Sequence, residues 1–190
     1  DPANRAWMSP VPTYTAPVNP GDVMAGFALG QVVRSNDPAF QVGDMVEGAT
    51  GWRRFAVVPG KSLRKRDMFD PPTALLSVLG ITGKTAWFGM AEIGRPRAGE
   101  VVLVSAAAGA VGSIAGQIAK NMGAKVIGIA GGEAKCRHVM QDLGSDAAID
   151  YKAERVPDGL KRLGIKAVDV YFDNVGGEML EGVLFRMADF

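Results

Sequence analysis

The chain has 190 residues, of which 47% are hydrophobic and 22% are charged, a composition typical of a globular protein with a packed core. Its formal net charge of +1 gives no electrostatic reason to expect binding to nucleic acid or to a membrane, and no apolar run approaches the roughly 18 residues of a membrane span. The single cysteine, Cys136, excludes an internal disulfide and favours a reducing, cytoplasmic compartment.

Residues 1–72 contain most of the prolines and several short apolar runs between turns. The runs lie at 30–33, 44–47 and 55–58. This spacing predicts short β-strands of a small, irregular, β-rich partial barrel. The basic run Arg64-Lys65-Arg66 is interpreted as a solvated turn rather than a nucleic-acid patch.

Residues 73–97 form a predicted connector, because their helical periodicity is broken by glycines. From 98 to 190, apolar strand-like runs alternate with helical patterns, as in βαβ units. Strands are expected at 101–106, 125–130, 146–151 and 168–174, and helices at 111–122, 133–143, 154–163 and 177–188. Right-handed crossovers then give an α/β fold with a doubly wound parallel sheet of the Rossmann type, beginning with the strand order 3-2-1-4.

The turn after the first of these strands carries a dinucleotide-binding pattern. Against G-x-G-x-x-G, Ala107 takes the first position, Gly109 the second and Gly112 the third. Gly109 removes a side chain where the backbone would approach a pyrophosphate, and Gly112 allows close helix packing. The expected cofactor-binding residues of the turn are Ala108, Gly109, Ala110, Val111 and Gly112. The alternative is a tight turn that binds nothing, but the flanking strand and helix and a second strand about 20 residues on favour the motif.

The end of the second strand predicts which dinucleotide binds. For NAD, an Asp or Glu is expected there to bond the ribose 2′-hydroxyl. This sequence has Gly131-Gly132 instead, followed by Lys135, a cation that can pair with a 2′-phosphate. The pattern therefore predicts NADPH. The alternative for Lys135 is a solvated surface lysine.

Polar residues also end the predicted third and fourth strands, at the carboxyl edge where such sheets bind ligands. Tyr151 follows the third strand, and Asn174 follows the fourth within Asp173-Asn174-Val175-Gly176-Gly177. Each has an alternative interpretation: Tyr151 as boundary packing, and Asn174 as a turn residue that caps the next helix. Asp173 is expected to be structural.

A zinc site is not expected, because Cys136 and the single histidine, His138, leave few ligands. Both lie on the predicted second helix beside Lys135. We interpret them as ordinary helix residues, so that any hydride chemistry would be metal-free.

Several segments match one protein family in order along the chain. They are Asp1-Pro2-x-x-Arg5, Gly43-Asp44, Gly51-Trp52, Leu79-Gly80-x-x-Gly83-x-Thr85-Ala86, the 106–112 turn, Gly116-Gln117, Lys135-Cys136 and the run 171–177. On these residues the chain resembles the zinc-independent medium-chain dehydrogenase/reductases, in the branch of prostaglandin reductases, alkenal double-bond reductases and bacterial curcumin-type reductases. It departs from the family at Asn4 and Ala6, where Met and Gly are usual.

The resemblance implies a GroES-like fold for 1–72 and NADPH-dependent reduction of the carbon–carbon double bond of α,β-unsaturated ketones or aldehydes. Hydride would pass to the β-carbon and leave an enolate. The resemblance also implies that Gly51 and Trp52 face the substrate cleft and that Thr85 lies near the nicotinamide. Tyr151 would hydrogen-bond the 2′-phosphate, and Asn174 would contact the cofactor near the ribose or nicotinamide.

Family members are considerably longer than this chain, so we expect truncation at both ends. The family's catalytic tyrosine is then expected beyond Phe190, and the full-length protein is expected to be a homodimer. Two alternatives stay open. A quinone reductase of the same superfamily uses the same cofactor residues, and a chain complete at Phe190 would favour a non-catalytic NADPH-binding protein.

Overall fold

The structure is a computed structural model that describes residues 2–11 and 16–189. Asp1, which begins the Asp-Pro match, and Phe190, beyond which the catalytic tyrosine is expected, lie outside the described residues. Of the helices that the structure describes, none has the length and apolar character needed to cross a membrane.

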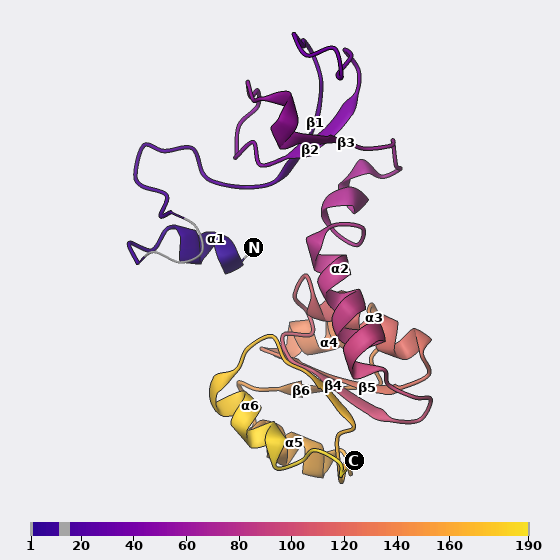
Figure 1. Cartoon of the computed structure of the whole chain (residues 1–190). Coiled ribbons are helices and arrows are strands. Elements are labelled where there is room, and N and C mark those ends of the chain that lie inside the picture. Colours follow the sequence, from indigo (N-terminus) through magenta and orange to yellow (C-terminus); the bar gives the residue numbers. More distant parts are fainter. Residues whose placement is uncertain (1, 12–15, 190) are drawn as a thin grey trace. The chain divides into compact units, whose positions relative to one another are not determined.

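The chain divides into two compact units, one ending at Ser77 and the other beginning at Val78 (Figure 1). The expected connector at 73–97 spans this division, and most of it belongs to the second unit. Each unit has its own sheet, antiparallel in the first and parallel in the second.

The first unit begins with helix α1 (Pro2–Trp7) and contains a three-stranded antiparallel sheet in the order β1-β2-β3. The strands are β1 (Ala28–Gln31), β2 (Met45–Gly48) and β3 (Leu63–Lys65). Two short 3-10 helices, η1 (Gly60–Ser62) and η2 (Pro72–Leu76), lie before and after β3 in the sequence.

Two expectations for this unit are wrong. Residues 55–58 form no strand, because the second edge of β2 pairs with β3 instead, and Phe55 is 71% exposed. The basic run at 64–66 is not a solvated turn, since its first two residues belong to β3. Lys65 pairs with Asp44 at 2.5 Å and Arg66 with Glu47 at 3.1 Å. Opposite charges on and just before the neighbouring strand β2 therefore face the basic residues at the end of this edge strand.

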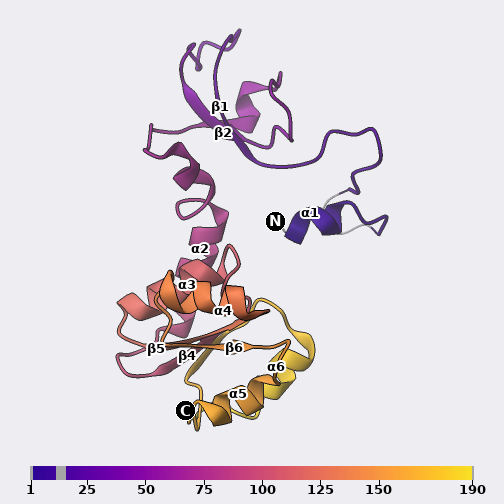
Figure 2. The same cartoon turned by 180° about the vertical axis from the view of Figure 1, so that it is seen from behind.

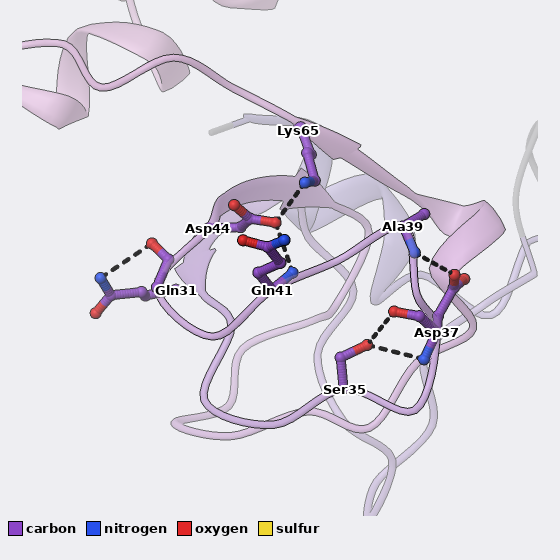
Figure 3. A network of polar contacts seen from close by, with 8 residues as sticks. Gln31, Ser35, Asp37, Ala39, Gln41, Asp44 and Lys65 are labelled. Carbon is purple, nitrogen blue, oxygen red and sulfur yellow. Dashed lines mark hydrogen bonds and ion pairs between the residues drawn. The ribbon is translucent and has the colours of Figure 1, made fainter.

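Side-chain hydrogen bonds hold the loop between β1 and β2 (Figure 3). Gln31 Nε2 donates to Gly43 O at 3.2 Å, and an Asp37 carboxylate oxygen accepts the Ala39 N–H at 2.9 Å. Asp44 accepts the Gln41 N–H at 2.8 Å as well as pairing with Lys65. The pKa of Asp44 is lowered, first by its hydrogen bond with Lys65 and then by the Gln41 N–H.

The second unit contains a four-stranded parallel sheet in the order β6-β5-β4-β7. Its strands are β4 (Val101–Val104), β5 (Lys125–Ala130), β6 (Ala147–Asp150) and β7 (Val170–Phe172). Counted along the chain from β4, this is the order 3-2-1-4, which confirms the predicted topology. The connecting helices are α3 (Gly112–Asn121), α4 (Glu133–Gln141) and α5 (Val156–Arg162), and α6 (Gly177–Leu184) follows β7.

Helices cover both faces of this sheet (Figures 1 and 2). On the α3 and α4 face, Val102, Val104 and Val126 form a core with residues of those helices. On the α5 and α6 face, Leu103 and Ile127 belong to a second core. Because successive residues of a strand face opposite sides, β4 and β5 must be apolar throughout, as the sequence pattern indicated.

The segment before β4 is helical and packs on the α3 side of the sheet. Helix α2 (Ile81–Trp87) continues into η3 (Phe88–Gly94), which is π-helical and ends with the Arg95 N–H donating to Met90 O at 2.8 Å. Gly89 permits the close approach to β7, because a Cβ there would lie 2.5 Å from the Phe172 ring.

Candidate cofactor site

The predicted cofactor residues of the second unit follow the carboxyl ends of its strands. The glycine turn follows β4, Lys135 comes after β5, Tyr151 after β6 and Asn174 after β7. The chain leaves β4 toward β5 on one side and returns to β7 on the other, so the β4–β7 pair marks the topological switch point. Ligands of doubly wound sheets bind in the crevice at this point.

The glycine turn is held by its own backbone. Ala106 has a left-handed φ of 48°, its carbonyl accepts the Gly109 N–H at 2.8 Å, and the Ala107 N–H donates to Ile129 O at 3.0 Å. A Cβ at Gly112 would lie 2.4 Å from Ala106 O, so only glycine fits there. A Cβ at Gly109 would meet only the oxygen and Cβ of Ala106, at 3.0 and 3.9 Å.

Free donors line this turn. Within the described residues, the N–H groups of Ala108, Ala110, Val111 and Gly112 have no hydrogen-bond partner. They lie at the N-terminus of the ten-residue helix α3, whose first turn has no acidic residue. The open side of Gly109 and these donors together fit a pyrophosphate group.

The turn after β5 has a steric reason for lacking a carboxylate. A Cβ at Gly131 would lie 2.8 to 2.9 Å from the Tyr151 ring and hydroxyl. An Asp or Glu at this position is therefore incompatible with the observed place of Tyr151, whose side chain is 50% exposed.

A carboxylate one residue before Tyr151 fixes the same turn. Asp150 Oδ1 accepts the N–H groups of Gly132 at 2.8 Å and Lys152 at 3.0 Å, and these two bonds lower the pKa of Asp150. Sequence reasoning did not identify Asp150, although an acidic residue at a strand end beside a glycine turn is a recognisable signal.

Lys135 lies exposed in the first turn of α4. Its side chain has no ion pair or hydrogen bond among the described residues, since the nearby Glu133 pairs with Arg137 at 2.6 Å. An unpaired ammonium group at a helix N-terminus is available to a phosphate.

Cys136 and His138 have local roles on the same helix. Cys136 is buried in the core, and burial, followed by the charges of Asp150 and Glu154, raises the pKa of its thiol. His138 Nδ1 lies 2.7 Å from Asp142. Over residues 2–11 and 16–189, no group of three or more His, Cys, Asp or Glu side chains could hold a metal ion.

Asn174 is tied to the end of β4. Its amide nitrogen donates to Ser105 O at 2.8 Å, and its backbone N–H donates to Ser105 Oγ at 2.7 Å. Ser105 is fully buried, and its hydroxyl donates in turn to Asp173 Oδ1 at 2.8 Å.

Asp173 accepts three more hydrogen bonds. The donors are the Tyr171 hydroxyl at 2.8 Å and the N–H groups of Val175 at 3.1 Å and Gly176 at 2.9 Å. Burial raises the pKa of Asp173, but these bonds and that of Ser105 outweigh it and leave the pKa below its usual value. Burial also raises the pKa of Tyr171. Sequence reasoning missed Ser105 and Tyr171, because their partners become visible only when β4 and β7 pair.

The remaining predicted site residues lie elsewhere. Thr85 is exposed on α2, where its hydroxyl donates to Ile81 O at 2.8 Å. Gly51 and Trp52 belong to the first unit. Gly51 has a left-handed φ of 72°, and Trp52 is 66% exposed, with its indole against Gly26.

The topological switch point, the donor-lined glycine turn and the unpaired Lys135 are features of a dinucleotide-binding domain. Comparison with known proteins identifies the family. The profile described as "N-terminal domain of oxidoreductase" matches residues 1–65, and that described as "Zinc-binding dehydrogenase" matches residues 110–189.

Curated relatives match almost the whole chain. The NADPH-dependent curcumin reductase of Escherichia coli (strain K12) is 42% identical over 97% of this chain and 54% of its own length. The 2-alkenal reductase (NADP(+)-dependent) of Nicotiana tabacum is 40% identical over 98% of this chain and 56% of its own length. The chain thus spans about half the length of the curated relatives it matches.

A solved structure agrees with this assignment. CurA from Vibrio vulnificus in complex with NADPH aligns with a TM-score of 0.82 and 38% identity, over 98% of this chain and 56% of that one. The chain belongs to the medium-chain dehydrogenase/reductases, in the zinc-independent branch that includes the curcumin, 2-alkenal and prostaglandin reductases.

Proposed function

We propose that this protein is an NADPH-dependent oxidoreductase that reduces the carbon–carbon double bond of α,β-unsaturated ketones or aldehydes without a metal ion. The observation that carries the cofactor choice is the turn after β5, where Tyr151 covers Gly131 and Lys135 is unpaired. The names of the relatives support the substrate class, since they include a curcumin reductase, a 2-alkenal reductase and prostaglandin reductases.

The residues of the second unit would hold the two ends of the cofactor differently. The free N–H groups of Ala108, Ala110, Val111 and Gly112 would bind the pyrophosphate, with Gly109 leaving room for it. Lys135 with the Tyr151 hydroxyl would bind the 2′-phosphate. Asn174 and Thr85 would orient the nicotinamide end.

NADPH supplies a hydride for the β-carbon of the substrate. The protein's part is to place the enone against the nicotinamide, and we assign Gly51 and Trp52 to the substrate cleft. Placement of this kind removes several kcal/mol from a barrier, of the order of about 7 kcal/mol in well-oriented cases. Hydrogen-bond donors at the enolate oxygen would add electrostatic stabilisation.

A quinone reductase activity is the second candidate. It is favoured by a quinone oxidoreductase of Pseudomonas syringae pv. Tomato DC3000, which aligns with a TM-score of 0.66 and 31% identity over 92% of this chain and 55% of that one. We prefer reduction of the carbon–carbon double bond because two closely matching curated relatives are named curcumin reductase and 2-alkenal reductase.

The proposal includes a cytoplasmic homodimer whose partner is a small-molecule enone, with no nucleic acid or membrane bound. The single cysteine supports the reducing compartment, and the net charge of +1 supports the absence of polyanionic partners. The homodimer rests on the family resemblance.

The direct test offers the protein NADPH with a simple enone or a simple quinone and analyses the products by mass spectrometry and NMR. We expect the saturated ketone with its carbonyl intact, faster turnover of the enone than of the quinone, and no loss after dialysis against a strong chelator. Faster quinone turnover would favour the second candidate. An allylic alcohol product, or activity that zinc alone restores, would refute the proposal.

A further inference from the structure

The side chains of Ser105, Tyr171, Asp173 and Asn174 form a hydrogen-bonded network at the ends of β4 and β7. It joins Ser105, the last residue before the glycine turn, to Asn174, the residue assigned to the nicotinamide end. Asp173 lies at its centre and accepts four hydrogen bonds. The network therefore lies at the switch point, between the glycine turn, which would hold the pyrophosphate, and Asn174, which would hold the nicotinamide end.

We infer that Asp173 is a positioning residue of the cofactor site and acts through Ser105 and Asn174 to set the nicotinamide half. The inference rests on the proposed function, because it concerns how the proposed cofactor is held. Nothing in it requires Asp173 to touch the cofactor.

The Asp173 carboxylate determines which way the Ser105 hydroxyl points, and Ser105 in turn holds Asn174. Ser105 has one hydroxyl proton and gives it to Asp173, so the oxygen lone pairs of Ser105 face the Asn174 N–H. The Asn174 amide nitrogen is committed to Ser105 O, which leaves its Oδ1 without a partner in the described part of the chain. The side chain of Asn174 thus presents an acceptor in a fixed direction at an exposed position.

Replacing Asp173 by Asn would reverse part of this pattern. An amide has one acceptor oxygen and a donating nitrogen, whereas the carboxylate receives four donors. Ser105, Tyr171 and Val175 all donate to Oδ1 of Asp173, and the Gly176 N–H donates to Oδ2. In the Asn variant the amide nitrogen would replace Oδ2 and face the Gly176 N–H as a second donor, and a neutral oxygen would hold the other three donors, including the Ser105 hydroxyl, more weakly than the carboxylate does. The direction of Asn174 would then be held less firmly.

The chain offers a matched control at the opposite ends of the same two strands. Asp169 Oδ2 accepts the Val101 N–H at 2.7 Å, so it also joins the β7 region to β4 by a carboxylate–N–H bond. It lies at the amino edge of the sheet, away from every proposed cofactor residue. Asp169→Asn makes the same carboxylate-to-amide change at a comparable bond without touching the site.

The experiment measures binding of two probes by titration, NADPH and adenosine 2′,5′-bisphosphate, which carries only the adenosine end. We expect Asp173→Asn to weaken NADPH about tenfold while changing the affinity for the bisphosphate less than about twofold. Asp169→Asn should change neither affinity. Thermal unfolding of each variant measures how much the substitution lowers the stability of the protein, separately from its effect on binding.

Two further variants test the route of action. Asn174→Ala should weaken NADPH by a similar factor, and the double variant Asp173→Asn/Asn174→Ala should show little additional loss, because both changes remove the same effect. Ser105→Ala should give the same pattern as Asp173→Asn, and it replaces that variant if Asp173→Asn does not fold.

The outcomes separate the inference from the proposed function. If the unaltered protein binds neither probe, the cofactor proposal fails. If it binds both, but Asp173→Asn or Ser105→Ala weakens both equally or weakens neither, the positioning role is overturned while the cofactor proposal stands. Additive losses in the double variant would show that Asp173 does not act through Asn174.

Discussion

At the scale of single residues, we expect the choice of cofactor to depend on Lys135 and its surroundings. The ammonium group is exposed and unpaired among the described residues, and the neighbouring Glu133 is neutralised by Arg137. A 2′-phosphate would therefore meet a cation with no competing carboxylate on the same turn. Tyr151 lies over Gly131, and an acidic side chain at Gly131 would have to displace its ring.

Lys135→Ala should weaken NADPH binding by about 1–3 kcal/mol, as expected for a charge-assisted contact, and leave NADH almost unchanged. Fluorescence titration with both nucleotides measures the two affinities. Lys166→Ala is the control, because Lys166 is an exposed lysine before β7 at the other edge of the sheet. A uniform loss for both nucleotides would mean that Lys135 contributes to folding rather than to phosphate recognition.

Sequence reasoning could identify those features of the candidate site that are encoded by consecutive residues. The glycine turn is one such feature, and Gly131 in place of an acidic residue at the end of β5 is another. The network of Ser105 and Asp173 is different, because its partners are 68 residues apart and meet only when the strands pair. The steric effect of Tyr151 on Gly131 likewise depends on the adjacent ends of β5 and β6.

At the scale of elements, the parallel sheet was predictable because strands buried on both faces are apolar throughout, and crossover handedness restricts their order. The first unit was predicted less well. An apolar run at 55–58 looks like a strand, yet the edge of β2 is taken by β3. Lys65 and Arg66, at the end of β3, pair with Asp44 and Glu47, which lie about 20 residues earlier in the chain. The sequence pattern within a short segment does not show which distant residues will supply the opposite charges.

Asp146 ties three elements of the second unit together. Its carboxylate receives Lys120 Nζ of α3 at 2.8 Å and the Val126 N–H of β5 at 2.7 Å, just before β6 begins. Burial raises the pKa of Asp146, but the bonds from Lys120 and Val126 outweigh this, and the pKa lies below its ordinary value. The ionised form is therefore favoured by folding.

The pH dependence follows from that direction. The stabilisation from Asp146 is complete above its unfolded pKa, about 3.9, and is lost as pH falls through the lower folded value. Asp146→Asn should therefore lower the free energy of unfolding by about 1–2 kcal/mol at pH 7 and by much less at pH 3, measured by urea denaturation. The control is Asp142, an exposed carboxylate that pairs with His138 on α4. Asp142→Asn should change the free energy of unfolding by less than about 0.5 kcal/mol. An equal difference at both pH values would contradict the assignment.

At the scale of the whole molecule, the two units divide the proposed work. The second unit contains the switch point, the glycine turn and Lys135, which we assign to the cofactor, and the first contains Gly51 and Trp52, which we assign to the substrate. The chain spans about half the length of its curated relatives. The proposed activity is the one named for those longer proteins, and for this chain it remains a proposal. The cofactor site is the part of the account that the described residues specify most fully.

The most direct test of the central claim is therefore a calorimetric titration of the protein with NADPH and with NADH at one ionic strength. The arrangement of Gly131, Tyr151 and Lys135 predicts that NADPH binds at least tenfold more tightly, a difference of about 1.4 kcal/mol. Equal affinities, or tighter binding of NADH, would contradict it.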